Sequence, residues 1–136
     1  MDITLTHTFV FVDDQDKALE FYRDLLGLEI RNDVKFDTMR WLAIGSPNQP
    51  DVEIVLIGTD QSYVAPDKDT LNALLAKGTM TACVFRVDDV DALYDKVKAS
   101  GAEIQQEPFS QAYGVRDCAF RDPAGNSVRF SQVLAA

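Results

Sequence analysis

The chain repeats one arrangement of hydrophobic and polar positions twice. The first copy begins with an alternating β-branched and aromatic run, His7 to Val12, which predicts a strand. A helix is predicted next, because Asp13 or Asp14 can accept backbone N–H bonds at its start and Gly27 can adopt the left-handed conformation that ends it. One apolar stripe recurs at helical spacing and consists of Ala18, Phe21, Tyr22, Leu25 and Leu26. Three more strands are predicted, at about 28–35, 39–45 and 52–58.

The second copy begins 75 positions later, since FVDD ends at Asp14 and RVDD ends at Asp89 (89 − 14 = 75). A predicted strand over 81–87 precedes a helix that Asp88 or Asp89 caps and Gly101 ends. The stripe of this helix consists of Val90, Leu93, Tyr94 and Val97. Three strands follow at about 102–107, 115–121 and 127–133, and the turn before the last reads Asp122-Pro-Ala-Gly-Asn126.

A repeat at half the chain length predicts two copies of one βαβββ module rather than a solenoid, which needs three or more repeats. Module one covers about 1–59 and module two about 80–136, and the linker of about 60–79 contains a short helix over 66–77. The 136 residues suit a single domain, so we expect one α+β domain over 1–136.

Composition and charge exclude several classes of function. Hydrophobic residues make up 46% and charged residues 26%, which is typical of a globular protein. The formal charge of −9 opposes binding to nucleic acid and to anionic membranes, and Lys and Arg do not cluster. No secretory leader is recognisable at the N-terminus, so a cytoplasmic location is expected. Cys83 and Cys118 lack the spacing of metal ligands and are expected to be buried free thiols.

Three segments carry a resemblance to a known family: DDQDKALEFYRDLLGLEI, FRVDDVDALYDKVKASGAEI and FRDPAGNSVRF. Together they resemble the vicinal oxygen chelate superfamily, which includes glyoxalase I, bleomycin-resistance proteins, fosfomycin-resistance enzymes and extradiol dioxygenases. The resemblance implies the glyoxalase/bleomycin resistance/dioxygenase fold, in which two βαβββ modules form a cup-shaped mixed sheet, and it implies a homodimer. These motifs identify the superfamily without selecting one of its chemistries.

The resemblance also implies positions for a metal. Enzymes of the superfamily take ligands from the first and last strand of each module, usually His or Gln and then Glu. In this chain those positions fall on His7 and Glu53 in module one, and on Ala82 (7 + 75 = 82) and Arg129 in module two. Alanine has no donor atom, and arginine keeps its proton and has no lone pair for a metal. We therefore expect no metal and no other cofactor, with a divalent metal as the alternative.

Alternation along the strands predicts which side chains line the cup. Arg129 faces the cup together with Arg86, while Val128 and Phe130 face the helix. Three roles are open for Arg129: an ion pair with Glu53 in place of the metal, an anchor for an anionic ligand group, or a solvated rim residue.

The remaining candidates are one histidine and four aromatic side chains. His7 is the only histidine; it is a candidate proton donor or acceptor in catalysis, or else a hydrogen-bonded wall residue. Phe9, Phe11, Trp41 and Tyr113 are candidates for an apolar lining that stacks on a flat ligand. The aromatic residues assigned to the helix–sheet core are Phe21, Tyr22, Phe85 and Tyr94.

The function that these residues favour is metal-independent binding of a small apolar or aromatic ligand in the cup, similar to bleomycin-resistance proteins. The alternative is a metal-dependent lyase, isomerase or dioxygenase of the superfamily, which His7 and Glu53 support in part. A dioxygenase site with two histidines cannot come from a chain that has one. A third hypothesis, a sensor or partner-binding module without catalysis, has no positive support in the residues. The sequence leaves the ligand, and whether the protein is an enzyme, open.

Overall fold

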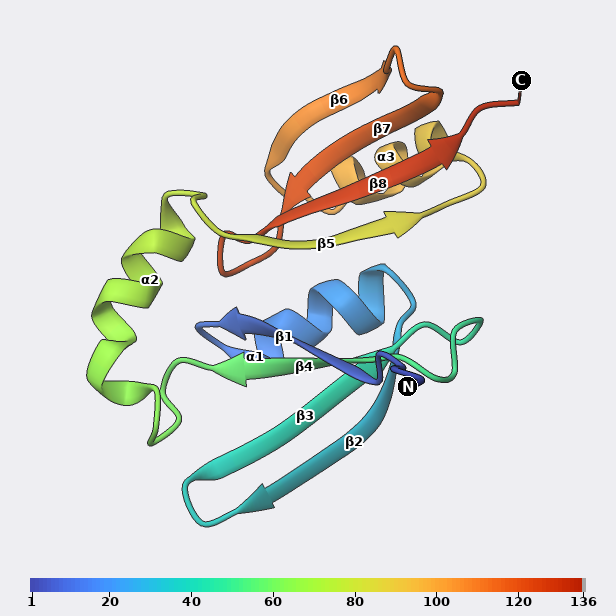
Figure 1. The fold of residues 1–136 in the computed structure, drawn as a ribbon. Coiled ribbons are helices and arrows are strands. Elements are labelled where there is room, and N and C mark those ends of the chain that lie inside the picture. Colours follow the sequence, from blue (N-terminus) through green and yellow to red (C-terminus); the bar gives the residue numbers. More distant parts are fainter. Residues whose placement is uncertain (136) are drawn as a thin grey trace. The chain divides into compact units, whose positions relative to one another are not determined.

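The chain folds into two compact units of the same topology. The computed structural model describes residues 1–135 and divides into Met1–Ala73 and a second unit from Leu74 onward. Each unit contains a four-stranded mixed sheet with a helix against one face, so the predicted α+β fold of two βαβββ modules is confirmed (Figure 1). The division falls inside the predicted linker of about 60–79. No helix within residues 1–135 is long and apolar enough to cross a membrane.

In the first unit the sheet has the strand order β1-β4-β3-β2. β1 and β4 run parallel, and the other neighbours are antiparallel. The predicted elements are found within one or two residues of their expected positions. Their bounds are β1 His7–Val12, α1 Gln15–Leu19, the π-helical segment η1 Glu20–Leu25, β2 Glu29–Phe36, β3 Met39–Gly45 and β4 Glu53–Gly58.

The first helix starts and ends as its sequence predicts, but it widens at its C-terminal half. The Asp14 carboxylate accepts hydrogen bonds from the backbone N–H groups of Asp16 (3.0 Å) and Lys17 (3.1 Å), which satisfies two free donors of the first turn. η1 is π-helical rather than α-helical: its Leu26 N–H donates to the carbonyl five residues back. Gly27 has a φ of 82° and ends the helix.

The second unit repeats this plan with the strand order β5-β8-β7-β6, in which β5 and β8 are parallel. Asp89 caps the helix by accepting from the Ala92 N–H at 3.0 Å, and Gly101 ends it with a φ of 88°. The helix buries Val90, Tyr94 and Val97 as predicted. The bounds are β5 Thr81–Arg86, α3 Val90–Ala99, β6 Ile104–Ser110, β7 Val115–Arg121 and β8 Ser127–Val133.

The turn before β8 is tied to the end of the linker helix. Asp122 is 4% exposed, and its Oδ1 accepts from the backbone N–H groups of Ala124, Gly125 and Asn126 at 2.9–3.0 Å. Gly125 has a φ of 112° and lies against the backbone carbonyl of Leu75, where a Cβ atom would overlap it. This turn therefore requires both the aspartate that closes it and the glycine that allows the close approach.

The linker contains regular secondary structure and packs on the first sheet. It contains the 3₁₀ turn η2 Ala65–Asp67 and the helix α2 Lys68–Ala76, as the predicted helix over 66–77 indicated. Val64 and Leu71 pack on the first sheet, on the face that α1 leaves open. Their contacts there are Phe11, Ala43, Val55 and Ile57. The linker thus covers part of that open face and leaves the rest exposed.

Candidate functional site

In the first unit, the face of the sheet opposite α1 (the module-one face) carries most of the predicted ligand-binding residues. The parallel register pairs His7 with Glu53, Phe9 with Val55 and Phe11 with Ile57. Paired residues point to the same side of a sheet. Val10 and Val12, which alternate with them, are buried on the helix side. The predicted orientation of β1 is therefore found in the structure.

His7 and Glu53 lie directly opposite each other on the first and last strands of the module. His7 Nε2 is 3.4 Å from Glu53 Oε2, and His7 Nδ1 is 3.0 Å from the Thr6 hydroxyl. Glu53 Oε1 is buried and has no hydrogen-bond partner among residues 1–135. The imidazole keeps 37% of its side-chain surface exposed, so it is accessible for hydrogen bonding to a ligand.

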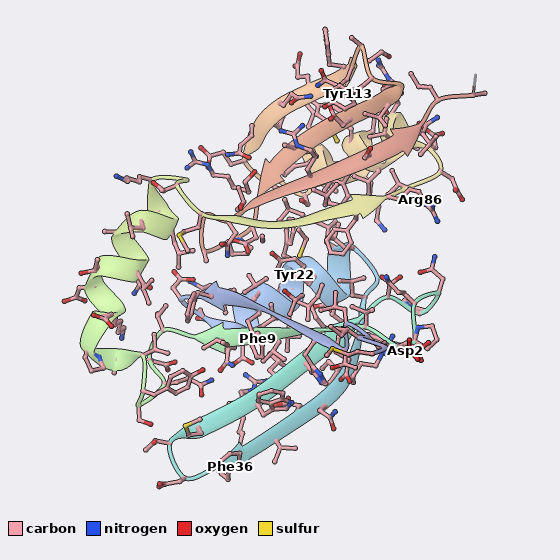
Figure 2. The ribbon with its side chains drawn as sticks, in the orientation of Figure 1. Asp2, Phe9, Tyr22, Phe36, Arg86 and Tyr113 are labelled. Carbon is pink, nitrogen blue, oxygen red and sulfur yellow. The ribbon has the colours of Figure 1, made fainter. Side chains whose placement is uncertain are left out.

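Two aromatic rings, Trp41 and Phe9, lie next to this pair, and a third, Phe11, lies further along β1 on the same face. The Trp41 ring centroid is 6.1 Å from that of His7 and 6.3 Å from that of Phe9, the second contact being edge-to-face. Phe9 is 55% exposed and Trp41 is 39% exposed. Figure 2 labels Phe9 on β1. Phe11 packs against a buried cluster that includes Val64 of the linker, so this predicted lining residue is partly covered rather than open.

A hollow of about 60 Å³ lies beside Trp41 on the same face. Sequence reasoning did not predict several of its lining residues, among them the aromatic and sulfur-containing side chains of Phe36, Met39 and Tyr63. The alternation of β3 could have identified Met39, which is two residues from Trp41, and the register would then add Phe36 opposite it (Figure 2). Tyr63 lies in the linker, where no periodicity indicates a face. The other lining residues are Arg40, Val55, Ile57 and Gln61.

In the second unit, the face of the sheet opposite α3 (the module-two face) carries Arg129. The register pairs Arg129 with Val84 of β5 and with Ala119 of β7. Ala82 is different from its module-one counterpart, because it lies at a bulge between the Thr81–Ser127 and Cys83–Val128 pairs. Ala82 and Arg129 are therefore not ladder partners in the way that His7 and Glu53 are.

Arg129 is engaged by a polar network that sequence reasoning had missed. Its Nη1 donates to Gln106 Oε1 at 2.8 Å and lies 3.3 Å from Asp117 Oδ2. Asp117 is only 2% exposed, and its Oδ1 accepts from the side-chain amides of Gln106 (2.7 Å) and Gln111 (3.0 Å). Burial alone would raise the pKa of Asp117, but the hydrogen bonds from Gln111 and Gln106 and the charge of Arg129 outweigh it and hold the pKa below its ordinary value.

Arg86 and Tyr113 are both exposed on the second unit (Figure 2). Arg86 pairs in register with Ser131, two residues beyond Arg129, and so shares its face. Tyr113 lies in the β6–β7 hairpin and is 73% exposed. The sequence-predicted residues therefore form two groups, with His7, Phe9, Phe11, Trp41 and Glu53 on the module-one face and Arg86 and Arg129 on the module-two face, while Tyr113 lies in the β6–β7 hairpin.

The donor atoms at the four family positions do not fit a catalytic metal. His7 and Glu53 offer two ligands, whereas catalytic zinc normally has three protein ligands. Ala82 and the guanidinium of Arg129 offer none. Within residues 1–135, no three His, Cys, Asp or Glu side chains gather closely enough to hold a metal ion. Cys83 and Cys118 are free, and burial raises the pKa of both thiols to about 11, which keeps them protonated at neutral pH.

Comparisons with known proteins agree with this architecture. The model of the Glyoxalase/Bleomycin resistance protein/Dioxygenase superfamily matches residues 4–130. The crystal structure of UcmS2 superimposes with a TM-score of 0.87 at 32% identity, covering 96% of this chain and 98% of that one. TnmS3, an antibiotic binding protein from Streptomyces sp. CB03234, gives 0.76 at 26% identity over 98% of both chains. A probable lactoylglutathione lyase of Vibrio cholerae is 29% identical over 94% of this chain and 89% of its own.

Proposed function

This chain belongs to the Glyoxalase/Bleomycin resistance protein/Dioxygenase superfamily, and we propose that it is a binding protein for a small apolar or aromatic molecule. The ligand rests on the module-one face, and no resident metal takes part. The similarity to TnmS3, an antibiotic binding protein, supports a binding role of this kind. So does the donor set at the family's metal positions, which contains only His7 and Glu53.

The observation that carries the proposal is the exposure of aromatic rings around the hollow on the module-one face. Phe9, Phe36 and Tyr63 are each more than half exposed, and Trp41 is 39% exposed. Aromatic surface left in water is favourable to bury, at roughly 25 cal/mol per Å² of apolar area, and ring stacking adds about 0.5–1.5 kcal/mol per pair. A flat apolar ligand that binds on this face gains free energy both from apolar burial and from ring stacking.

The size of the hollow indicates how the ligand is held. Pockets for drug-sized ligands measure about 300–1,000 Å³, far above the 60 Å³ of this hollow. Only one edge of such a ligand enters the hollow, so the rest lies over Phe9 and Trp41. The exposed edge of His7 is then placed to hydrogen-bond a polar group of the ligand, as a donor or an acceptor according to its tautomer.

The proposal is tested with a neutral aromatic probe, 2-naphthamide, by isothermal titration calorimetry with and without EDTA. Binding that EDTA leaves unchanged is expected. Trp41 is the only tryptophan, so its indole N–H gives a single NMR signal that should shift on titration. Phe9→Ala should weaken binding about tenfold, since it removes a ring worth on the order of 1–2 kcal/mol in contact.

The matched control is Ile104→Ala, which removes apolar surface from a 36% exposed residue on β6, opposite the buried Phe120. This variant should bind 2-naphthamide as the wild-type protein does. Equal weakening by Phe9→Ala and Ile104→Ala, or an indole signal that does not move, would contradict binding on the module-one face.

A metal-dependent lyase is the second candidate, and one observation favours it. His7 and Glu53 occupy paired positions on the first and last strands of their module, and the chain is 29% identical to a probable lactoylglutathione lyase. Elemental analysis of the purified protein separates the two candidates. Stoichiometric Ni, Zn, Fe or Mn that is lost in His7→Ala would replace the metal-independent proposal.

We also propose that the protein works as a homodimer in the cytoplasm. The membership in the superfamily motivates this assembly, and the acidic net charge of −9 keeps the assembly soluble. Sedimentation velocity at micromolar concentration should give about twice the chain mass of 15.1 kDa. A monomer that persists across a hundredfold range of concentration would contradict it.

A further inference from the structure

The module-two face presents a guanidinium group with one end engaged and one edge free. The engaged atom is Arg129 Nη1, which contacts Gln106 and Asp117. The Nε and Nη2 atoms of Arg129 make no hydrogen bond to any residue in 1–135. The side chain is 37% exposed, so this free edge is open to a ligand.

The free edge is the one that this chain uses elsewhere to bind carboxylates. Arg40 donates from Nε and Nη2 to the two carboxylate oxygens of Asp33, both at 2.9 Å. Arg116 makes the same pair of bonds to Asp91, again both at 2.9 Å. Two parallel N–H donors match the spacing of two carboxylate oxygens, and such bidentate bonds are among the stronger hydrogen bonds in proteins. Arg129 therefore offers a carboxylate-shaped edge that the described part of the chain leaves unfilled.

The buried network fixes the direction of that edge. Gln106 bridges the two charged groups, since its Oε1 accepts from Arg129 while its Nε2 donates to Asp117. Gln111 Nε2 donates to the same carboxylate oxygen of Asp117. A guanidinium that is already held in place loses less conformational entropy when it binds a ligand.

Apolar side chains flank the guanidinium on the same face. Val84 is the parallel ladder partner of Arg129 and is 68% exposed. Phe109 is the ladder partner of Asp117 and is 59% exposed. A pair of N–H donors beside exposed apolar surface matches a molecule that has both an apolar body and a negatively charged head group.

We propose that the module-two face is a second ligand-binding surface, on which Arg129 anchors the carboxylate group of an apolar or aromatic ligand and Asp117 positions Arg129. The inference goes beyond the site proposed on the module-one face, because it assigns a separate surface of the second unit to a carboxylate-bearing ligand. Arg86, on the same face, adds a second positive charge that favours the anion. A neutral ligand of the same shape makes at most one of the two charge-assisted bonds.

The test compares 2-naphthoate with 2-naphthamide, which share a ring system and differ in charge, by calorimetry on the full-length protein. The wild-type protein should bind the carboxylate about tenfold more tightly, a difference of about 1.4 kcal/mol. Arg129→Gln should remove this preference, so that the variant binds 2-naphthoate and 2-naphthamide with about equal affinity. Arg129→Lys keeps the charge without the forked edge and should retain only part of the preference.

The matched control is Arg116→Gln, which removes the same charge from the same sheet. Arg116 pairs with Asp91 of α3 and so lies on the opposite face from Arg129. The preference of this variant for 2-naphthoate over 2-naphthamide should stay within about twofold of the wild-type preference. An equal loss in Arg116→Gln and Arg129→Gln would mean that only net charge matters, and it would overturn the assignment.

The Asp117→Asn variant tests whether Asp117 positions Arg129 or only neutralises its charge. The two roles predict opposite changes in the affinity for 2-naphthoate. If Asp117 positions the guanidinium, the variant should bind 2-naphthoate more weakly than wild type, because the edge is no longer held. If Asp117 only neutralises Arg129, the variant should bind the anion more tightly, and the positioning role is overturned. Circular dichroism verifies the fold of the variant, and Arg129→Gln decides the anchor independently if Asp117→Asn does not fold.

The outcomes also separate this inference from the function proposed for the module-one face. Wild-type protein that binds both probes equally well retains an apolar binding site but has no carboxylate anchor, so only the inference fails. If the wild-type protein binds neither probe at millimolar concentration, both the proposed binding function and the carboxylate anchor are contradicted.

Discussion

At the scale of single residues, Arg129 and Asp117 form one unit. A carboxylate that is 2% exposed is costly unless it is paired, and Arg129 supplies the positive charge while two glutamines supply hydrogen bonds. A glutamate at position 129, as the family's metal pattern would have it, would put two carboxylates side by side. The loss of the metal ligand and the presence of Asp117 are therefore physically consistent with each other.

Gly125 gives a sharp prediction at the same scale. Gly125→Ala adds a Cβ atom that overlaps the Leu75 carbonyl and also strains a backbone with a φ of 112°. We expect a loss of about 2–4 kcal/mol in the free energy of unfolding, measured by urea denaturation. Gly114→Ala is the control, since its φ is 85° but nothing lies within 4 Å of the added atom, and it should cost only about 1 kcal/mol.

Sequence reasoning located the module-one candidates well and the partners of Arg129 poorly. The spacing that put His7 and Glu53 at related positions is confirmed by their register, because both lie on regular parallel strands. The orientation of Asp117 could have been predicted. In β7 it lies two residues from Val115 and from Ala119, so all three side chains point to one face of the strand, which is the face of Arg129. Gln111 lies outside a strand, so no periodicity could have assigned its contact.

At the scale of elements, local signals determined most boundaries. Capping aspartates and terminal glycines act over a few residues, so both helices of the two modules start and end where the sequence predicts. Where a boundary differs from its prediction, the cause lies in contacts with residues far away in the sequence. β6 begins at Ile104 and continues to Ser110 because it pairs with β7 through two register shifts, and such bulges depend on the partner strand. The π-helical turns of η1 carry no sequence signal that we can identify.

The linker is the element that sequence reasoning described least completely. Its helix was predicted, but its packing was not, because Val64 and Leu71 meet residues of three different strands. This packing has a functional consequence within the first unit. Phe11 is partly covered, while Phe9 and Trp41 remain exposed. The position of the linker thus decides which part of the module-one face is exposed.

At the scale of the whole molecule, two modules with one framework carry two different faces. The helix-side cores are apolar in both, with Leu42, Ile44 and Leu56 in one and Phe120, Val128 and Phe130 in the other. The faces opposite the helices differ: one combines aromatic rings with a His–Glu pair, and the other holds a charged network beside apolar side chains. A repeated framework therefore fixes the fold, and substitutions on the open faces set the chemistry of each module.

Acid stability is the whole-molecule property that these charges determine. Hydrogen bonding to Arg40 lowers the pKa of Asp33, and hydrogen bonding to Arg116 lowers the pKa of Asp91. The pKa of Asp117 is lowered as well, because its hydrogen bonds and Arg129 outweigh the effect of burial. A carboxyl group whose pKa is lower in the folded than in the unfolded protein stabilises the fold above its ordinary pKa, near 3.8, and that contribution is lost as the pH falls through the folded value.

The free energy of unfolding should therefore fall steeply below about pH 4, where these carboxylates become protonated. Asp117→Asn should be less stable than wild type by about 1–3 kcal/mol at pH 6, because a buried charge-assisted network is lost. That difference should shrink toward pH 3, since protonation removes the same charge from the wild-type protein. Urea denaturation at several pH values measures both curves, with Asp13→Asn, an exposed carboxylate outside these contacts, as control. A constant difference between wild type and Asp117→Asn from pH 6 to pH 3 would show that the ionised form of Asp117 does not stabilise the fold.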